Sequence, residues 1–168
     1  MNKTRDIVLI AIFATILFTQ EQVLLFLPSV QLTFFLIILF SKTLGLKRSV
    51  LIVIIYVFLD NMFMASFNMV YTPFMLLGWL IIPISLNTIF KKVEDSFSLA
   101  LLAILFSLLY SWIYIIPATM IMNIKFWPYL MADIPFEIVM CISSFVTTLW
   151  LYDPCSKVIN KLLKNVIA

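Results

Sequence analysis

The sequence predicts an all-α integral membrane protein: a bundle of six transmembrane helices with the N-terminus and the C-terminus in the cytoplasm. Composition and the placement of basic residues predict this fold class. Of the 168 residues, 64% are hydrophobic and 11% are charged, and the mean hydropathy is +1.16. Soluble domains are about 45–50% apolar and about 25% charged, so this chain has too few polar side chains to cover a soluble globule. We expect a single transmembrane domain over residues 1–168.

Six apolar blocks give the expected helices. They lie at about 6–27, 30–44, 49–66, 70–90, 97–121 and 130–152. A hydrocarbon core about 30 Å thick needs about 20 helical residues, so the second block is short. Either residues at its two ends complete the crossing, or this helix lies where the bilayer is locally thin. The basic start and first apolar run lack a small-residue cleavage site, so we expect a retained first span.

The basic residues indicate how these blocks are oriented, because short cytoplasmic loops collect Lys and Arg. If all six blocks cross with the N-terminus inside, the inner segments hold ten of the eleven basic residues, and Lys125 is the exception. If block 30–44 did not cross, the basic residues at 42–48 and 91–92 would move to the outer face. The bias would then vanish, which favours six spans.

Acidic and amide side chains gather at the outer ends of these helices. Asp133 and Glu137 are four residues apart and share one helix face, and the fifth block carries Ser107, Ser111 and Tyr114 on a face of its own. A charge inside a bilayer costs roughly 2.5–3.5 kcal/mol, so such faces point into the bundle or a wet cavity. We expect a solute pocket open to the outside, roofed by the connection between the first two helices and walled by the third to sixth.

The candidate substrate-binding residues are Glu21, Gln31, Asp60, Asn61, Asn68, Tyr71, Tyr114, Trp127, Asp133 and Glu137. The alternative is that the Tyr and Trp residues belong to the interfacial belts and that the serines serve helix packing. Outer acids and amides suit a neutral or cationic heterocycle better than a polyanion.

The first helix carries a patch of small residues that suits a partner helix. Ala11, Ala14 and Thr15 form this patch, and Ala11 and Thr15 are four residues apart, so another helix could approach closely there. Packing within the same bundle is the alternative, and the spacing does not separate the two.

Catalytic and metal chemistry find little support in the sequence. Histidine is absent, and the two cysteines, Cys141 and Cys155, form no metal-binding pair. We expect no catalytic residue, no metal ligand and no cofactor, and no nucleic-acid partner. No G-x-x-x-x-G-K-[ST] motif is present, so energy for any transport must come from a partner.

The stretches "TRDIVLIAIFATIL", "TLGLKRSV" and "LDNMFMASFNMVYTPFMLLGWLIIP", together with six spans in this length, carry a resemblance. The chain resembles the substrate-binding S components of energy-coupling factor (ECF) transporters of the bacterial plasma membrane. The resemblance implies high-affinity binding of a vitamin or related micronutrient near the outer face. It also implies docking on a transmembrane coupling subunit that works with two cytoplasmic ATPases. The family's A-x-x-x-A docking pattern would map onto Ala11 and Thr15, with Thr in place of the second Ala.

Two other classes remain open at this point. One is a non-enzymatic six-span membrane scaffold, similar to the MreD proteins of cell-shape machinery, whose polar stripes would contact other helices and bind no ligand. The other is a membrane enzyme, which is the weakest, because no nucleophile with a base in reach can be nominated. Stoichiometric binding of a small molecule distinguishes the first hypothesis from the scaffold.

Overall fold

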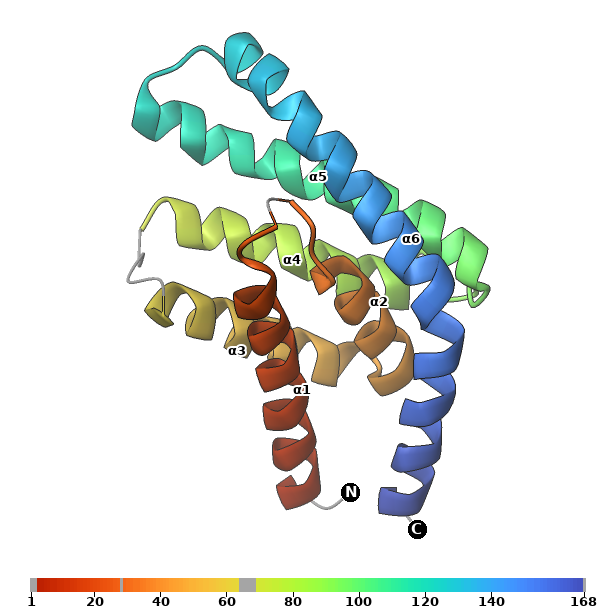
Figure 1. The fold of residues 1–168 in the computed structure, drawn as a ribbon. Coiled ribbons are helices and arrows are strands. Elements are labelled where there is room, and N and C mark those ends of the chain that lie inside the picture. The colour runs from red at the N-terminus through yellow and green to blue at the C-terminus, as the bar shows by residue number, and fades with distance from the viewer. Residues whose placement is uncertain (1–2, 28, 64–68, 168) are drawn as a thin grey trace.

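The computed structural model describes residues 3–27, 29–63 and 69–167. Its described parts form six helices without strands, which confirms the all-α class (Figure 1). The helices are α1 Lys3–Leu24, α2 Thr33–Leu44, α3 Leu46–Phe63, α4 Tyr71–Asn87, α5 Ser96–Met122 and α6 Phe126–Ile167. Each corresponds to one of the six apolar blocks.

Three of these helices are long and apolar enough to cross a membrane, which indicates a membrane protein. The qualifying stretches are Thr4–Leu24, Ser96–Met122 and Phe126–Lys164. Helices α2 and α4 are apolar but shorter, and α3 carries Lys47, Arg48 and Asp60 within 18 residues.

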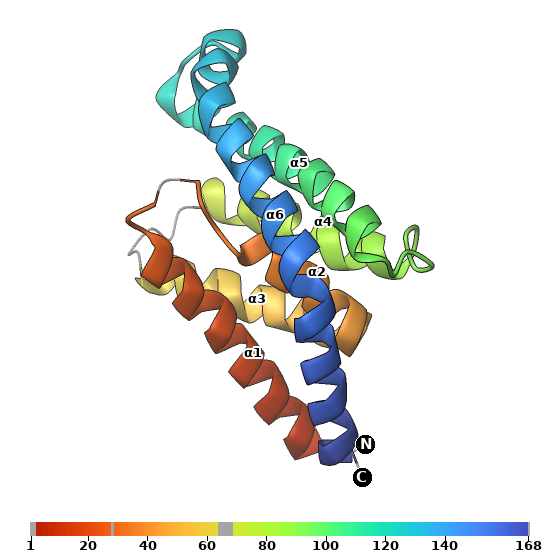
Figure 2. The same cartoon turned by 45° about the vertical axis from the view of Figure 1, so that its right-hand side comes forward.

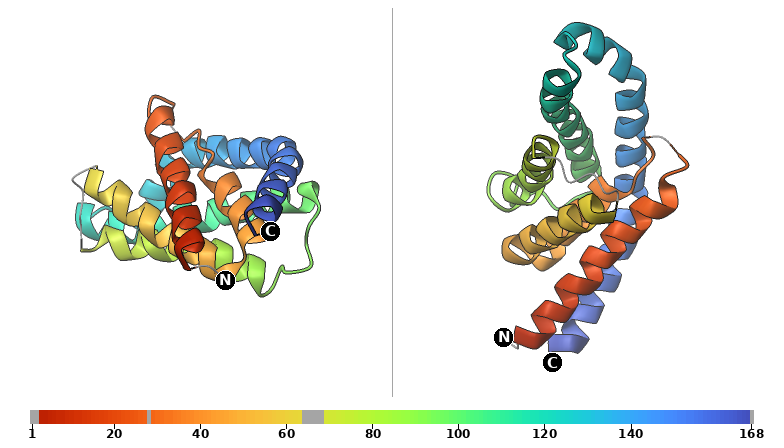
Figure 3. Two further views of the ribbon diagram at one scale, coloured as in Figure 1. Left: turned by 90° about the horizontal axis from the view of Figure 1, so that it is seen from below. Right: turned by 90° about the vertical axis from the view of Figure 1, so that its left-hand side faces the viewer.

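Five helices form an arc around α2. Along this arc α1 contacts α3, α3 contacts α4, α4 contacts α5, and α5 contacts α6, while α2 contacts all five. Figures 1 and 2 show α3 and α4 lying side by side, with α1 against the other side of α3 and the α5–α6 pair beyond α4. Both views in Figure 3 place the two chain ends next to each other. The molecule therefore has its N-terminus and C-terminus at one end.

Helix α2 is the buried centre of the bundle. Ten of its twelve residues are buried, among them Phe34, Ile38 and Ser41. Twelve helical residues span only about 18 Å, well short of the hydrocarbon core. Because all five other helices contact α2, its ends can bond to protein groups, as at Leu32 and Lys42. The short second block is thus accommodated inside the bundle.

A single residue, Gly45, separates α2 from α3. Its φ of 79° lies in the left-handed region that glycine adopts at little cost. This tight turn sends the chain directly from the buried α2 into α3.

Helix α6 is longer than the sequence pattern predicts. The expected span was 130–152, whereas the helix runs from Phe126 to Ile167, about 63 Å in length. Beyond residue 152 it continues because Tyr152, Ile159 and Leu163 are buried on one face and hold it against the bundle. The lysines expected in a cytoplasmic tail therefore lie on a helix.

Basic residues near the ends of α2 and α3 bond to helices that are distant in sequence. Arg48 forms a salt bridge with Asp6 at 2.8 Å, which joins the first turns of α3 and α1. The Lys42 ammonium donates hydrogen bonds to the carbonyl of Leu86 in the last turn of α4, at 3.4 Å, and to that of Phe90 just after the helix, at 2.8 Å. This gathering agrees with the one-sided distribution of Lys and Arg.

Helix α5 begins at a side-chain cap. The Asp95 carboxylate accepts a hydrogen bond from the Ser98 backbone N–H at 2.8 Å, and this bond lowers the pKa of Asp95 from its usual value.

The central position of α2 makes its packing a stability determinant. We expect Ile38→Ala, at a fully buried site, to lower the free energy of unfolding by about 2–5 kcal/mol, because a cavity opens where five helices meet. Ile12→Ala on α1, where the side chain is 50% exposed, is the matched control and should cost much less. Unfolding in detergent micelles measures both, and equal losses would contradict the central role of α2.

Candidate functional site

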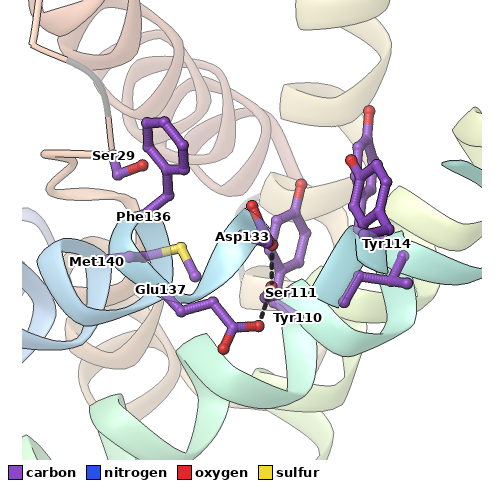
Figure 4. A pocket seen from close by; sticks show the side chains of 10 residues that line it. Ser29, Tyr110, Ser111, Tyr114, Asp133, Phe136, Glu137 and Met140 are labelled. Carbon is purple, nitrogen blue, oxygen red and sulfur yellow. Dashed lines mark hydrogen bonds between the residues drawn. The ribbon is translucent and has the colours of Figure 1, made fainter. Parts of the chain in front are cut away.

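Two carboxylates on α6 converge on one hydroxyl of α5. The Ser111 hydroxyl lies 2.6 Å from Glu137 Oε1 and 3.0 Å from Asp133 Oδ2 (Figure 4). The i, i+4 spacing places both acids on one face of α6, and the antiparallel packing of α5 turns Ser111 towards that face. Glu137 is only 7% exposed. The sequence predicted the shared face of the two acids but not the hydroxyl that joins them.

A cavity of ≈ 260 Å³ lies beside this triplet. It is lined by Ser29, Tyr110, Ser111, Tyr114, Ile115, Tyr129, Asp133, Phe136, Glu137 and Met140 (Figure 4). All but one of these residues belong to α5 and α6. The exception, Ser29, belongs to the connection between α1 and α2. A mainly apolar and aromatic wall with a few convergent polar groups is the usual composition of a small-molecule site.

Aromatic rings lead from this cavity to the centre of the bundle. The ring of Tyr71 lies 5.2 Å from that of Tyr114, which stacks with Tyr110 at 5.9 Å and an interplanar angle of 19°. Tyr110 lies 4.1 Å from Trp79, and Trp79 lies 4.8 Å from Phe34 of α2. The tyrosines at the cavity are therefore positioned by the rings packed behind them.

Glycine at position 78 allows this aromatic packing. A Cβ atom there would lie 2.7 Å from Cδ2 of the Tyr110 ring, closer than van der Waals contact allows. Gly78 thus lets the Tyr110 ring lie against the backbone of α4. Gly78 was not among the candidate residues.

A second polar cluster joins the end of α1 to α3. The Tyr56 hydroxyl donates a hydrogen bond to Glu21 Oε2, and Gln22 Nε2 donates to Asp60 Oδ1 at 3.4 Å. Both Tyr56 and Asp60 are buried. Each of the two acids therefore has a donor of its own. Neither lies among the residues that line the α5–α6 cavity.

Glu21 instead lines a neighbouring cavity of ≈ 320 Å³, together with Gln31. This cavity is formed by the end of α1 and the connection to α2, and it shares Ser29 with the α5–α6 cavity. The Gln31 backbone N–H and carbonyl both contact the Ser143 hydroxyl of α6, at 3.3 and 3.4 Å. The α1–α2 connection is thus fixed to α6 next to the α5–α6 cavity.

Gln20 holds the first turn of α2 in place. Its Oε1 accepts the Leu32 backbone N–H at 3.1 Å, and its Nε2 donates to Thr33 Oγ1 at 2.7 Å and to the Leu17 carbonyl at 3.1 Å. Because the first N–H groups of a helix lack partners within the helix, this amide serves as a cap supplied from α1. Gln20 was not among the candidate residues, although it stands in the same polar run as Glu21.

Asn61 and Trp127 do not line the α5–α6 cavity. Asn61 joins helices: its Nδ2 donates to the Val57 carbonyl at 2.8 Å, and its Oδ1 accepts the Thr72 hydroxyl at 2.9 Å. Trp127 is 69% exposed and packs edge-on against Phe126. Asn68 lies outside the described residues.

The small patch predicted on α1 divides between two faces. Ala14 is fully buried in the bundle, whereas Ala11 and Thr15 are exposed. The Thr15 hydroxyl donates to the Ala11 carbonyl at 2.8 Å, so it presents little free polar surface. Helix α1 contacts only α2 and α3 among the described helices, which leaves the Ala11–Thr15 side uncovered.

Comparison with known proteins gives no match: no family model, no curated protein and no solved structure is significantly similar to this chain. What the chain does is therefore inferred from its own residues.

The Gln20 cap gives a direct test of how the α1–α2 connection is held. We expect Gln20→Ala to lower the free energy of unfolding by about 1–3 kcal/mol, because the Leu32 N–H loses its buried acceptor. Backbone hydrogen exchange should rise at the start of α2, which mass spectrometry of peptides over residues 25–40 can follow. Gln22→Ala is the matched control, since it removes a weaker hydrogen bond two residues away. The assignment of the cap is wrong if both variants exchange alike at the start of α2.

Proposed function

We propose that this protein is a membrane-embedded solute-binding subunit that takes up a vitamin or related micronutrient from outside, like the S component of an ECF transporter. The observation that carries the proposal is the α5–α6 cavity, with its tyrosine wall and the Ser111–Asp133–Glu137 triplet. Charged groups buried in a transmembrane bundle are costly and mark solute or ion sites more often than packing contacts. A scaffold has no need of such a group next to a cavity.

The proposed arrangement has six spans in the bacterial plasma membrane with both termini in the cytoplasm. The adjacent chain ends support it, since an even number of crossings returns the chain to its starting side (Figure 3). Arg48 pairs with Asp6 in the first turn of α1, and Lys42 bonds at the end of α4, so two basic segments meet the helix ends that this arrangement assigns to the cytoplasm. The cavity then opens near the outer face.

The orientation is tested by labelling introduced cysteines in intact cells, in a background with Cys141→Ala and Cys155→Ala. We expect a membrane-impermeant maleimide to label Lys125→Cys from outside, and to label Lys92→Cys only after permeabilisation. Both lysines are exposed, so accessibility to solvent on the relevant side decides the result. Labelling of both positions in intact cells, or of Lys92→Cys alone, would contradict the six-span arrangement.

Transport in this proposal requires a transmembrane coupling subunit and two cytoplasmic ATPases, because the chain has no nucleotide-binding motif. The exposed side of α1 at Ala11 and Thr15 is proposed as the docking face. Its small side chains and the absence of a covering helix within the described bundle support this choice.

The first experiment is mass spectrometry of small molecules released from gently purified protein, grown in rich medium. We expect one compound at close to one molecule per chain. In Glu137→Gln the recovered amount should fall at least about tenfold, because a hydrogen bond to a buried charged group contributes roughly 1.5–3 kcal/mol.

Glu94→Gln is the control, because Glu94 is exposed and does not line the α5–α6 cavity. Circular dichroism and thermal unfolding should be unchanged in both variants, which separates loss of binding from loss of fold. An empty wild-type protein, together with no saturable binding of added vitamins, would favour the scaffold instead.

A further inference from the structure

We propose that the α5–α6 cavity selects an organic cation: a flat ring bearing a positively charged group with at least two N–H donors. This inference rests on the proposed binding function and names the chemical class of its ligand. It depends on the hydrogen-bond inventory of the triplet, the charges around the cavity and the aromatic wall.

The triplet has fewer donors than acceptors. A serine hydroxyl carries one hydrogen, so Ser111 can donate to Glu137 or to Asp133 at any moment, but not to both. Within the described part of the chain, Ser111 is the donor found for these two carboxylates. Within the triplet, one of the two carboxylate oxygens at hydrogen-bond distance of Ser111 therefore receives no hydrogen from it. A ligand that brings two N–H groups supplies the missing donor.

The charge around the cavity has one sign. Its two ionisable acids, Asp133 and Glu137, face no Lys or Arg among the lining residues. The nearest basic residue in sequence, Lys125, is exposed and does not line the cavity. Since Coulomb interactions strengthen as water is excluded, a ligand carboxylate or phosphate would be repelled here and a cation attracted.

Aromatic rings line the same cavity. Tyr110 and Tyr114 are stacked, and both line the cavity beside Ser111 (Figure 4). A cation over the face of a tyrosine gains about 0.5–2 kcal/mol, and a flat ring can stack there. A cavity of ≈ 260 Å³ admits a small heterocycle but not a large nucleotide-like cofactor.

Three probes of nearly equal shape test this inference: benzamidinium, benzamide and benzoate, which are a cation, a neutral amide and an anion. Saturation-transfer NMR titrations should use the full-length protein in phosphatidylcholine nanodiscs, with empty nanodiscs as the blank. We expect benzamidinium to bind at least about tenfold more tightly than benzamide, the factor that corresponds to one charge-assisted hydrogen bond. Benzoate should show no saturable binding.

Variants of the triplet then assign the preference to the site. In Glu137→Gln the affinity for benzamidinium should fall to that for benzamide, and Asp133→Asn should reduce it several-fold. Glu94→Gln should leave all three affinities unchanged. Position 133 is partly exposed, so Asp133→Asn should perturb the fold less than a change at the buried Glu137. It therefore serves as the test if Glu137→Gln unfolds.

Three results would overturn the inference: benzoate binding as tightly as benzamidinium, equal affinities for benzamide and benzamidinium, or no binding of any probe. Saturable binding of benzamide or benzoate that Tyr114→Ala abolishes would leave the proposed function intact and reject only the preference for cations. Absence of all binding, with no compound released from the purified protein, would reject the proposed function as well.

Discussion

The burial of α2 by all five other helices is the constraint on which the rest of the structure depends. A helix of twelve residues cannot cross a bilayer alone, so its ends must meet protein groups that replace water. Gln20 of α1 meets the first turn through the Leu32 N–H, and the Lys42 ammonium of α2 itself donates to the carbonyls beyond α4. These bonds tie α1 to the start of α2 and the end of α2 to the segment that ends α4.

The polar run at the end of α1 follows from this arrangement. Its three residues, Gln20, Glu21 and Gln22, bond to the start of α2, to Tyr56 and to Asp60 respectively. Glu21 accepts the Tyr56 hydroxyl and lines the cavity beside the α1–α2 connection. The same connection carries Ser29 to the α5–α6 cavity and bonds to Ser143 of α6 at Gln31. The fixed start of α2 therefore also positions one side of the candidate site.

The sequence predicted those features that depend on spacing within one helix. Six apolar blocks became six helices, and the four-residue spacing of Asp133 and Glu137 placed them on one face of α6. Features that depend on how helices pack could not be predicted from the sequence. They are the central place of α2, the pairing of Ser111 with both acids, and the contact of Gly78 with Tyr110. The last span was expected to end near residue 152, yet α6 continues to Ile167 because Tyr152, Ile159 and Leu163 recur on one face. That Ala14 is buried while Ala11 and Thr15 are exposed could likewise not be predicted, because it depends on the side of α1 against which α3 packs.

The two acidic clusters differ in a way that connects the fold to the chemistry. Glu21 accepts a hydrogen bond from Tyr56 and Asp60 accepts one from Gln22, and these two bonds join α1 to α3. Asp133 and Glu137 share one hydroxyl, although the same chain supplies amides and tyrosines elsewhere. A hydrogen bond to a charged group contributes roughly 1.5–3 kcal/mol, so a ligand that brings a second donor to these two acids would be bound more tightly. The two acids that join α1 to α3 have one donor each, whereas the two acids at the cavity share one hydroxyl.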